Sequence, residues 1–337
     1  MNALICTIPG NFEYKKIAEP VPAPGNSIIK IKRVGVCGTD LHAYEGTQPY
    51  FSYPRILGHE IAAEIVQTDA PGFSKSDIVT LIPYFNCGKC VACRNGKPNC
   101  CVSLKVSGVH IDGAMVEYLS VPSYSLVHSK NISSNVLALV EPLAIGAHGI
   151  RRANPKEDEF VLVIGAGPIG LGVMEFAKIA GARVIAMDVN KTRLQFCGNE
   201  MGIEYLVDAT SPDHIEKLME ITNGEMPTVV LDATGNLKAI QNGFNYLAHG
   251  GRYVLVGLQK ENISISHPEF HKREATLMSS RNATREDFEK VISSISEKKI
   301  DPAKFITHQV AFEKVRDEFP KWLKPETKVI KAIIEIN

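Results

Sequence analysis

The sequence has no long apolar run and no excess of charge of either sign. No stretch of about 18 consecutive apolar residues, the length that spans a bilayer, occurs among its 337 residues. The first residues also lack the basic and apolar regions of a signal peptide, which favours a cytoplasmic location. Lys plus Arg and Asp plus Glu number 37 each, so no positive field attracts nucleic acid or anionic lipid. We therefore expect a small-molecule partner, and neither nucleic acid nor membrane.

Cysteine is also scarce, and its distribution is uneven. Eight Cys in 337 residues are too dilute for a disulfide scaffold, and five of them lie between positions 87 and 101. In a protein without an export signal, such a cluster indicates a metal site. The apolar fraction of 45% and the charged fraction of 22% are those of an ordinary globular protein, which excludes disordered and fibrous classes. At about 100–200 residues per domain, the length predicts two domains.

The residue pattern changes twice along the chain. Residues 1–140 contain short β-branched runs separated by Pro and Gly, which predicts an irregular β-rich domain. Residues 141–280 alternate apolar strands with amphipathic helices, which predicts a parallel sheet covered by helices on both faces, and hence an α/β fold. The tail, 281–337, offers one more helix and one more strand. The expected strands are 27–36, 60–66, 76–82, 160–167, 183–188, 204–209, 228–235, 252–258 and 328–336, and the expected helices are 168–182, 190–202, 237–251 and 285–299.

A glycine-rich turn follows the apolar strand that begins at Val161. Its G-x-G-x-x-G sequence opens a helix and is made of Gly165, Gly167, Pro168, Ile169 and Gly170. In this context the motif predicts a dinucleotide site, with the pyrophosphate at the helix N-terminus. Asp188 ends the next strand, where a carboxylate accepts hydrogen bonds from the adenosine ribose and repels a 2′-phosphate, which favours NAD. Arg193 argues for caution, because a nearby Arg accommodates that phosphate.

The cysteines of the cysteine-rich loop have the spacing of a metal-binding site. Four thiolates and no open position describe a structural zinc that stiffens the loop. Cys100 precedes Cys101, so the sequence leaves open which of the two is the fourth ligand. An iron–sulfur cluster and free thiols are the rival interpretations. The predicted ligands are Cys87, Cys90, Cys93 and Cys101.

A second group of candidate ligands lies nearer the N-terminus. Cys37, His59 and Glu60 bring a thiol, an imidazole and a carboxylate within about 25 residues of sequence. Mixed S, N and O ligands with one open position describe a catalytic zinc. Taken alone, a single Cys or His is more often a packed core residue.

These segments, together with Glu141-Pro-Leu and in this order along the chain, resemble the zinc-dependent medium-chain alcohol and polyol dehydrogenases. The resemblance covers essentially the whole chain. It implies a GroES-like catalytic domain at 1–140, completed by 281–337, and a Rossmann domain at 141–280, with the active cleft at their junction. It also implies two zinc ions per chain, NAD as cofactor, and a homo-oligomer, either dimer or tetramer. We expect the oligomer to form through the edge of the Rossmann sheet, with strand 252–258 as the candidate edge.

The resemblance also implies roles for individual residues. Cys37, His59 and Glu60 would bind the catalytic zinc. Glu141 stands where the ethanol-type enzymes have a second cysteine, a departure that indicates the polyol branch; its alternatives are a helix cap or an ion pair. Thr39 and His42 occupy the positions of the family's proton relay, although His42 could instead cap a turn or face solvent.

A finer resemblance concerns the substrate. The segments 51–60, 267–274 and 280–284 are similar to those of the sugar-acid branch, the bacterial L-galactonate and L-gulonate 5-dehydrogenases. This implies oxidation of the C5 hydroxyl of a hexonate to D-tagaturonate or D-fructuronate. A neutral chain needs a local cation for such a carboxylate, and Arg281 is the first candidate, followed by Lys272, Arg273 and Arg55. The alternatives are a neutral polyol or secondary-alcohol dehydrogenase of the sorbitol type and, from another class, a non-catalytic NAD-binding regulator.

Overall fold

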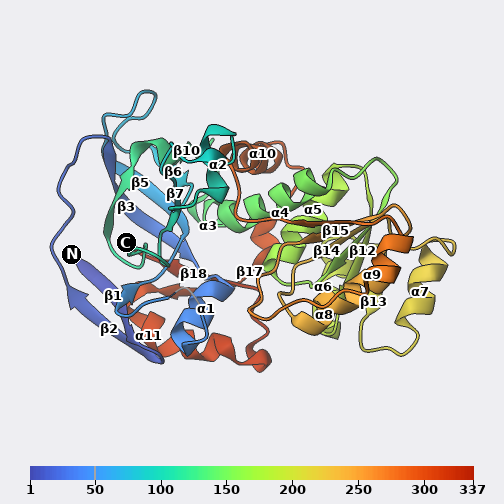
Figure 1. Ribbon diagram of the computed structural model, residues 1–337. Coiled ribbons are helices and arrows are strands. Elements are labelled where there is room, and N and C mark those ends of the chain that lie inside the picture. The colour runs from blue at the N-terminus through green and yellow to red at the C-terminus, as the bar shows by residue number, and fades with distance from the viewer. Residues whose placement is uncertain (49–50) are drawn as a thin grey trace. The chain divides into compact units, whose positions relative to one another are not determined.

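The computed structural model describes residues 1–48 and 51–337 and divides into two compact units. The first, here called the β-rich unit, consists of Met1–Glu141 and Thr284–Asn337, and the second, the Rossmann unit, of Pro142–Ala283. Both ends of the chain belong to the β-rich unit (Figure 1). Within the described residues, no helix combines the length and the apolar character that crossing a bilayer requires.

The β-rich unit is built around a seven-stranded sheet with the order β10-β6-β5-β3-β18-β17, in which β9 also pairs with β3. A three-stranded sheet, β2-β1-β4, and the pair β7-β8 accompany it. The strands of this unit are β1 (Asn2–Ile8), β2 (Asn11–Lys16), β3 (Asn26–Gly35), β4 (Arg55–Ile56), β5 (Glu60–Gln67), β6 (Ile78–Leu81), β7 (Tyr84–Phe85), β8 (Lys105–Val106), β9 (Tyr118–Pro122), β10 (Leu126–His128), β17 (Ile306–Ala311) and β18 (Lys331–Glu335). Its helices are α1 (Gly38–Glu45), α2 (Val91–Arg94), α3 (Ser134–Leu137), α10 (Arg285–Ser296) and α11 (Val315–Glu318), and α4 (Val140–Ala153) begins in it.

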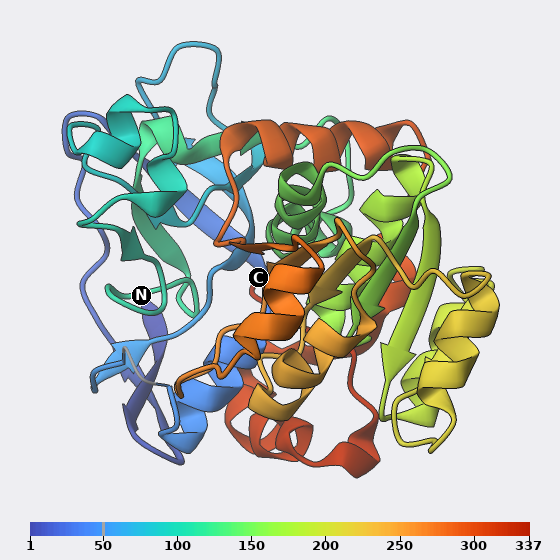
Figure 2. The ribbon, with the colours of Figure 1, turned by 45° about the vertical axis from the view of Figure 1, so that its right-hand side comes forward.

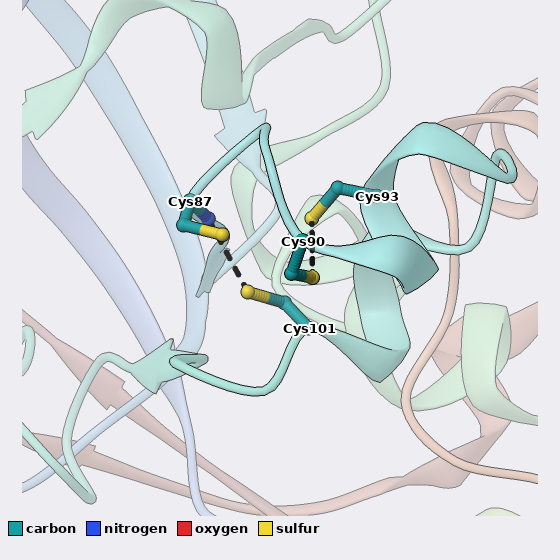
Figure 3. Close-up of side chains that lie close together, drawn as sticks. All are labelled: Cys87, Cys90, Cys93 and Cys101. Atoms are coloured by element: carbon teal, nitrogen blue, oxygen red, sulfur yellow. Dashed lines mark hydrogen bonds between the residues drawn. The ribbon is translucent and has the colours of Figure 1, made fainter.

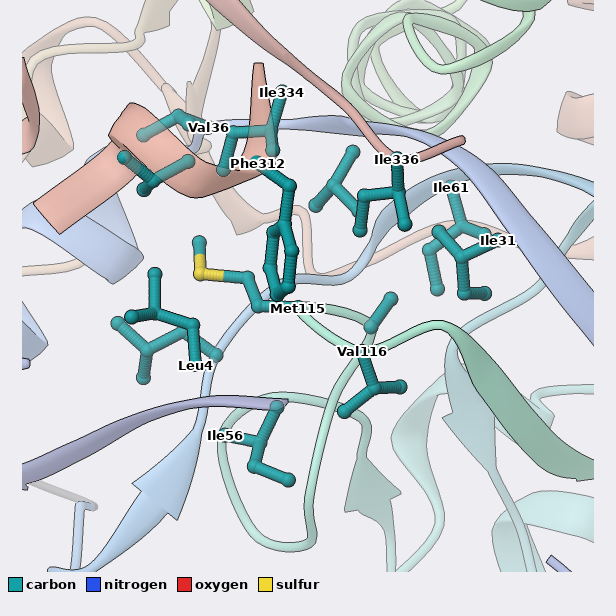
Figure 4. Packing of buried hydrophobic residues seen from close by; sticks show 14 of the residues in the cluster. Leu4, Ile31, Val36, Ile56, Ile61, Met115, Val116, Phe312, Ile334 and Ile336 are labelled. Atoms are coloured by element: carbon teal, nitrogen blue, oxygen red, sulfur yellow. The ribbon is translucent and has the colours of Figure 1, made fainter. Parts of the chain in front are cut away.

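Strand β18 joins the tail of the chain to the N-terminal segment. It pairs antiparallel with β3 and parallel with β17. The alternating pattern of both strands places Ile31 and Ile334 in one core, together with Leu4, Met115 and Phe312, all at most 5% exposed. Figure 4 shows the Phe312 ring between these aliphatic side chains. The tail is therefore an integral part of this core.

The Rossmann unit contains a six-stranded, wholly parallel sheet with the order β13-β12-β11-β14-β15-β16. Helices flank both faces of this sheet (Figures 1 and 2). The order reverses between β11 and β14, which is the topological switch point where such sheets bind ligands. The predicted α/β class is confirmed. The elements are β11 (Phe160–Ile164), β12 (Arg183–Asp188), β13 (Tyr205–Asp208), β14 (Val229–Asp232), β15 (Arg252–Leu255), β16 (Thr276–Ser279), α5 (Pro168–Ile179), α6 (Lys191–Asn199), α7 (His214–Ile221), α8 (Leu237–Gly243) and α9 (His267–Lys272).

The expectation that strand 252–258 forms the sheet edge is wrong. Strand β15 pairs on one side with β14 and on the other with β16, so it lies inside the sheet. The sequence analysis did not identify β16, because its four residues, TLMS, show neither a buried run nor a regular alternation. Strand β16 ends the order of the sheet and takes the place proposed for β15.

Candidate metal centres and nucleotide site

The four predicted cysteines of the loop come together in the β-rich unit. Their sulfur atoms all lie within 4.8 Å of one another. Helix α2 begins after Cys90 and carries Cys93, and the chain returns through a short 3-10 helix, Pro98–Cys100, to Cys101. Figure 3 shows the four thiols converging from these segments. The exposed Cys100 lies outside the group, so the geometry favours Cys101 as the fourth ligand.

Backbone amides donate hydrogen bonds to two of these sulfur atoms. The amides of Cys87 and Ser103 donate to Cys101 Sγ, at 3.3 and 3.4 Å. Hydrogen bonds from the amides of Cys93 and Val102 lower the pKa of Cys90 to about 6. Because zinc binds thiolates rather than thiols, the lowered pKa of Cys90 fits the expected structural ion, whereas burial and the thiols of Cys90 and Cys101 raise the pKa of Cys93 to about 12.

The mixed group also forms, at the border between β3, α1 and β5. Ligand atoms of Cys37, His59 and Glu60 lie within 4.8 Å of one another. Cys37 is the N-cap of α1, Glu60 begins β5, and His59 directly precedes that strand. Gly35 pairs with Glu60 across the sheet, and a Cβ atom at position 35 would overlap the Glu60 carboxylate. Glycine at this position therefore makes room for the Glu60 side chain.

Asp40 fixes the local structure around this group, although the sequence analysis gave it no role. Its fully buried carboxylate accepts hydrogen bonds from the Cys37 amide at 2.9 Å and the Gly58 amide at 3.2 Å. One of its oxygens also lies 3.7 Å from His59 Nδ1. A carboxylate behind a ligating histidine orients the ring. Its position three residues after the cap at Cys37, typical of a capping box, was the available signal.

Lys331 is a second residue that the sequence analysis missed. Its ammonium group, on β18, lies 2.6 and 2.7 Å from the two carboxylate oxygens of Glu60 and 3.0 Å from the Val36 carbonyl oxygen. Lys331 is 1% exposed and Glu60 is fully buried. Burial has the largest single effect and lowers the pKa of Lys331, but Glu60, Cys37 and Glu141 together outweigh it and raise this pKa above the ordinary value. Glu60 is therefore both a candidate ligand and one half of a buried ion pair.

Glu141 is near the mixed group but is not one of the three residues whose ligand atoms lie within 4.8 Å of one another. It is 2% exposed and accepts a hydrogen bond from the phenol of Tyr84 on β7. Burial raises the pKa of Glu141 to about 7, while the positive charge of His59 opposes the shift. Among the described residues, the other Glu141 oxygen, Oε2, has no hydrogen-bond partner.

The residues of this site fit a divalent cation. Three carboxyl groups and the Cys37 thiol converge there, whereas Lys331 is the one lysine among them in the part of the chain that the structure describes. Burial opposes a charge on His59, but Asp40 and Cys37 overcome this and raise its pKa well above the ordinary value. Surroundings that favour a positive charge at His59 also suit a cation, because metal binding displaces protons from its ligands. Thiolate, imidazole and carboxylate together are a donor set that zinc accepts.

The two predicted relay residues lie on α1. Thr39 is half-buried, two residues after Cys37. The His42 side chain is 63% exposed, and its Nδ1 lies 3.1 Å from Thr47 Oγ1 and 3.5 Å from Glu45. His42 can therefore exchange a proton with water.

The glycine turn has the geometry that the motif predicts. Gly165 has a φ of +101°, and a Cβ atom there would meet the backbone that follows β14. Helix α5 begins at Pro168 with Gly167 as its N-cap. The Asp188 carboxylate accepts hydrogen bonds from the amides of Ala166 at 2.6 Å and Asn190 at 2.8 Å. These bonds fix the Asp188 carboxylate against the turn.

Arg193 also reaches this turn. A Cβ atom built on Gly167 would lie 3.7 Å from Arg193 Nη1. The guanidinium group on α6 therefore stands next to the N-terminus of α5. Ile169 and Gly170 lie in the first turn of α5, and Gly170 is so close to the Gly165 carbonyl that a side chain would not fit.

The four cations suggested for a substrate carboxylate differ in their surroundings. Arg273, the C-cap of α9, pairs with Glu269 at 2.5 Å, and Arg55 contacts Ser52 at 2.8 Å and Asp112 at 3.4 Å. Arg281 and Lys272 are exposed, the first just after β16 and the second at the end of α9.

A parallel sheet with a glycine-rich phosphate turn and a mixed Cys/His/Glu group in a β-rich unit together define a zinc-type dehydrogenase. Residues 23–131 match the family described as the alcohol dehydrogenase GroES-like domain, and residues 168–297 match the zinc-binding dehydrogenase family. The chain belongs to the zinc-dependent medium-chain alcohol and polyol dehydrogenases, as the motifs predicted, and is an oxidoreductase. The predicted GroES-like and Rossmann folds are confirmed.

Individual relatives agree with this assignment. The chain is 42% identical to the L-galactonate-5-dehydrogenase of Escherichia coli K12 over 336 residues, covering 99% of this chain and 98% of that protein. It is 33% identical to the sorbitol dehydrogenase of Halalkalibacterium halodurans over 317 residues, covering 92% of each. A crystal structure described as a short chain alcohol dehydrogenase from E. coli CFT073, complexed with NADH, superposes with a TM-score of 0.92 at 29% identity and covers 100% of this chain and 99% of that one.

Proposed function

We propose that this enzyme uses zinc and NAD to oxidise the C5 hydroxyl of a sugar acid such as L-galactonate or L-gulonate. The product would be the keto-acid, D-tagaturonate or D-fructuronate. The observation that carries the dehydrogenase chemistry is the compact group formed by Cys37, His59 and Glu60. The substrate class is supported by the 42% identity to an L-galactonate-5-dehydrogenase over nearly the whole chain.

The residues of the site would have different roles in the reaction. Bound zinc would polarise the substrate hydroxyl and lower its pKa. Cys37, His59 and Glu60 would hold that ion, with Glu141 beside them. Thr39 would accept the hydroxyl proton, and the exposed His42 would release it to water. The four loop cysteines would hold a second zinc that stabilises the fold.

The nucleotide site favours NAD over NADP. The Asp188 carboxylate is fixed against the glycine turn by two backbone amides. In that position it would accept hydrogen bonds from the ribose hydroxyls and repel a 2′-phosphate. Arg193, which stands next to the same turn, would neutralise the pyrophosphate.

Asp188→Ser should lower kcat/KM for NAD by about 10- to 100-fold, the loss expected for hydrogen bonds to a charged group. It should also reduce discrimination against NADP. Steady-state kinetics with both cofactors measure the change. Asp208→Ser is the matched control. Asp208 is the register partner of Asp188, and it ends the neighbouring strand β13 as Asp188 ends β12. An unchanged cofactor preference in Asp188→Ser would contradict the assigned role.

The proposed anchor for the substrate carboxylate is Arg281, with Lys272 as the second choice. A planar guanidinium group binds a carboxylate through two parallel hydrogen bonds, which an ammonium group cannot do. Arg281 and Lys272 are exposed, whereas Arg273 and Arg55 are half-buried.

NADH formation at 340 nm by the zinc-loaded enzyme should be fastest with L-galactonate or L-gulonate, compared with D-gluconate, sorbitol, xylitol and galactitol. Arg281→Ala should lower kcat/KM for the preferred acid by about 10- to 100-fold, because a charge-assisted hydrogen bond is lost. Lys272→Ala should have a much smaller effect. Equal effects of the two substitutions would rule out Arg281 as the anchor.

A neutral polyol is the second candidate substrate. The 33% identity to a sorbitol dehydrogenase over 92% of the chain supports it. Activity confined to sorbitol, xylitol or galactitol would select this function and remove the need for a carboxylate anchor. The zinc sites and the hydride chemistry would be the same in both cases.

We also propose that the enzyme is a homo-oligomer, a dimer or tetramer, assembled through β16. This strand ends the order of the Rossmann sheet, and an edge strand presents backbone groups that a second copy can pair. Leu277 on β16 is 37% exposed, which adds apolar surface to that edge.

A further inference from the structure

The hydrogen bond between Tyr84 and Glu141 lies entirely within the β-rich unit. Tyr84 is 5% exposed and Glu141 2%. The phenol of Tyr84 donates to Glu141 Oε1. The other oxygen, Oε2, is buried without a hydrogen-bond partner among the described residues. Tyr84 therefore binds one oxygen of this carboxylate, and the second oxygen is available to bind a metal ion.

Tyr84 is itself held in place by its surroundings. It pairs with Val106 in the β7-β8 ladder, and the amide of Ser107 donates to the carbonyl oxygen of Pro83 at 3.0 Å. Its ring packs edge-to-face against Phe288 of α10, with 6.3 Å between centroids. A phenol restrained in this way cannot follow a moving carboxylate, so it acts as a fixed anchor for Glu141.

The other buried glutamate of the site has a different environment. Both oxygens of Glu60 accept hydrogen bonds from Lys331, whereas Tyr84 is the one donor to the Glu141 carboxylate in residues 1–48 and 51–337. The charges of His59, Glu60 and Lys331 all act on the Glu141 carboxyl, so it shares the electrostatic surroundings of the candidate metal ligands. Of the two carboxylates, Glu141 is the one with an oxygen still to be satisfied.

We propose that Tyr84 is a positioning residue that holds Glu141 Oε1 and thereby leaves Oε2 as the single oxygen that Glu141 offers to the metal ion. The inference rests on the proposed function, because it requires a metal held by Cys37 and His59. Without the phenol, the Glu141 carboxylate would rotate, and its one-oxygen approach would be lost. Substitution of a residue that orients a metal ligand in this way typically lowers metal affinity or activity by about 10- to 100-fold.

The test replaces zinc with cobalt, whose visible absorption reports the ligand geometry, and compares Tyr84→Phe with Tyr14→Phe. Tyr14 is the matched control, because its phenol also donates within the β-rich unit, but to the Phe312 carbonyl oxygen and not to a candidate metal ligand. We expect Tyr84→Phe to change the cobalt spectrum and to speed metal loss to a chelator by about 10- to 100-fold. Tyr14→Phe should match the unaltered enzyme in both measurements.

A double substitution separates positioning from a general structural effect. If Tyr84 acts through Glu141, Tyr84→Phe should change neither the spectrum nor the rate of metal loss once Glu141→Gln is present. Independent effects in the double variant would overturn the inference. So would a Tyr84→Phe enzyme with an unaltered spectrum and rate, and in that case the proposed function would stand. Absence of any Cys37-dependent metal in the unaltered enzyme would overturn both.

Discussion

Lys331→Ala is expected to lower the free energy of unfolding of the β-rich unit by about 3–5 kcal/mol, the cost of leaving one partner of a buried ion pair unpaired. Glu60 is fully buried, and both of its oxygens accept hydrogen bonds from Lys331. The ammonium group also satisfies the Val36 carbonyl oxygen. Removing it leaves a carboxylate and a carbonyl without their donor. Urea unfolding measures the loss, followed through Trp322, the single tryptophan, which is buried in this unit.

A surface pair of the same chemistry provides the control for this prediction. Lys15 and Glu13 form an ion pair 2.9 Å long, with side chains 51% and 45% exposed. Lys15→Ala should change stability by less than about 1 kcal/mol, because water and salt screen exposed pairs. Lys331→Met combined with Glu60→Gln should recover much of the loss, since no unpaired charge remains. A Lys331→Ala enzyme as stable as Lys15→Ala would show that the buried pair does not stabilise the fold.

The second large effect distinguishes the two metal centres. Cys90→Ala should lower the unfolding free energy by more than about 4 kcal/mol, because losing a structural metal is among the most damaging single changes. Cys37→Ala should cost far less stability but reduce turnover to background. Each variant should retain about one zinc per chain, against two in the unaltered enzyme. Metal analysis, thermal unfolding and NADH formation together measure these differences.

Cys100 provides the control within the same loop. It is exposed and lies outside the four-sulfur group. Cys100→Ala should therefore keep both ions, full stability and full activity. Equal stability losses in Cys90→Ala and Cys37→Ala would contradict the division into a structural and a catalytic site.

Local patterns were sufficient for much of the fold, for the glycine turn and for the cysteine loop, whereas the group of Cys37, His59 and Glu60 also needed the resemblance of the whole chain to a known family. The turn at Gly165 and the acid at Asp188 are encoded within about 30 residues of sequence, and their geometry depends on a strand, a turn and a helix that adjoin one another. The cysteine loop is similarly local. In each case the residues that act together are close in the sequence, so their spacing predicts their geometry.

The missed residues share the opposite property. Lys331 reaches Glu60 from a strand 271 positions away, and Tyr84 reaches Glu141 across 57. Their contacts depend on the order and register of the sheets, which hydrophobic periodicity does not specify. Strand β16 was missed for a related reason, since an exposed edge strand of four residues has no burial pattern to detect.

The insertion of the Rossmann unit also determines the order in which the chain can fold during synthesis. The ribosome completes Pro142–Ala283 before it makes β18, which lies between β3 and β17 in the main sheet of the β-rich unit. The Rossmann unit has all its strands at that stage, whereas the N-terminal segment still lacks a central strand. During translation the nucleotide-binding half can therefore fold first, and the metal-binding half must wait with an open sheet until Lys331 and its neighbours emerge.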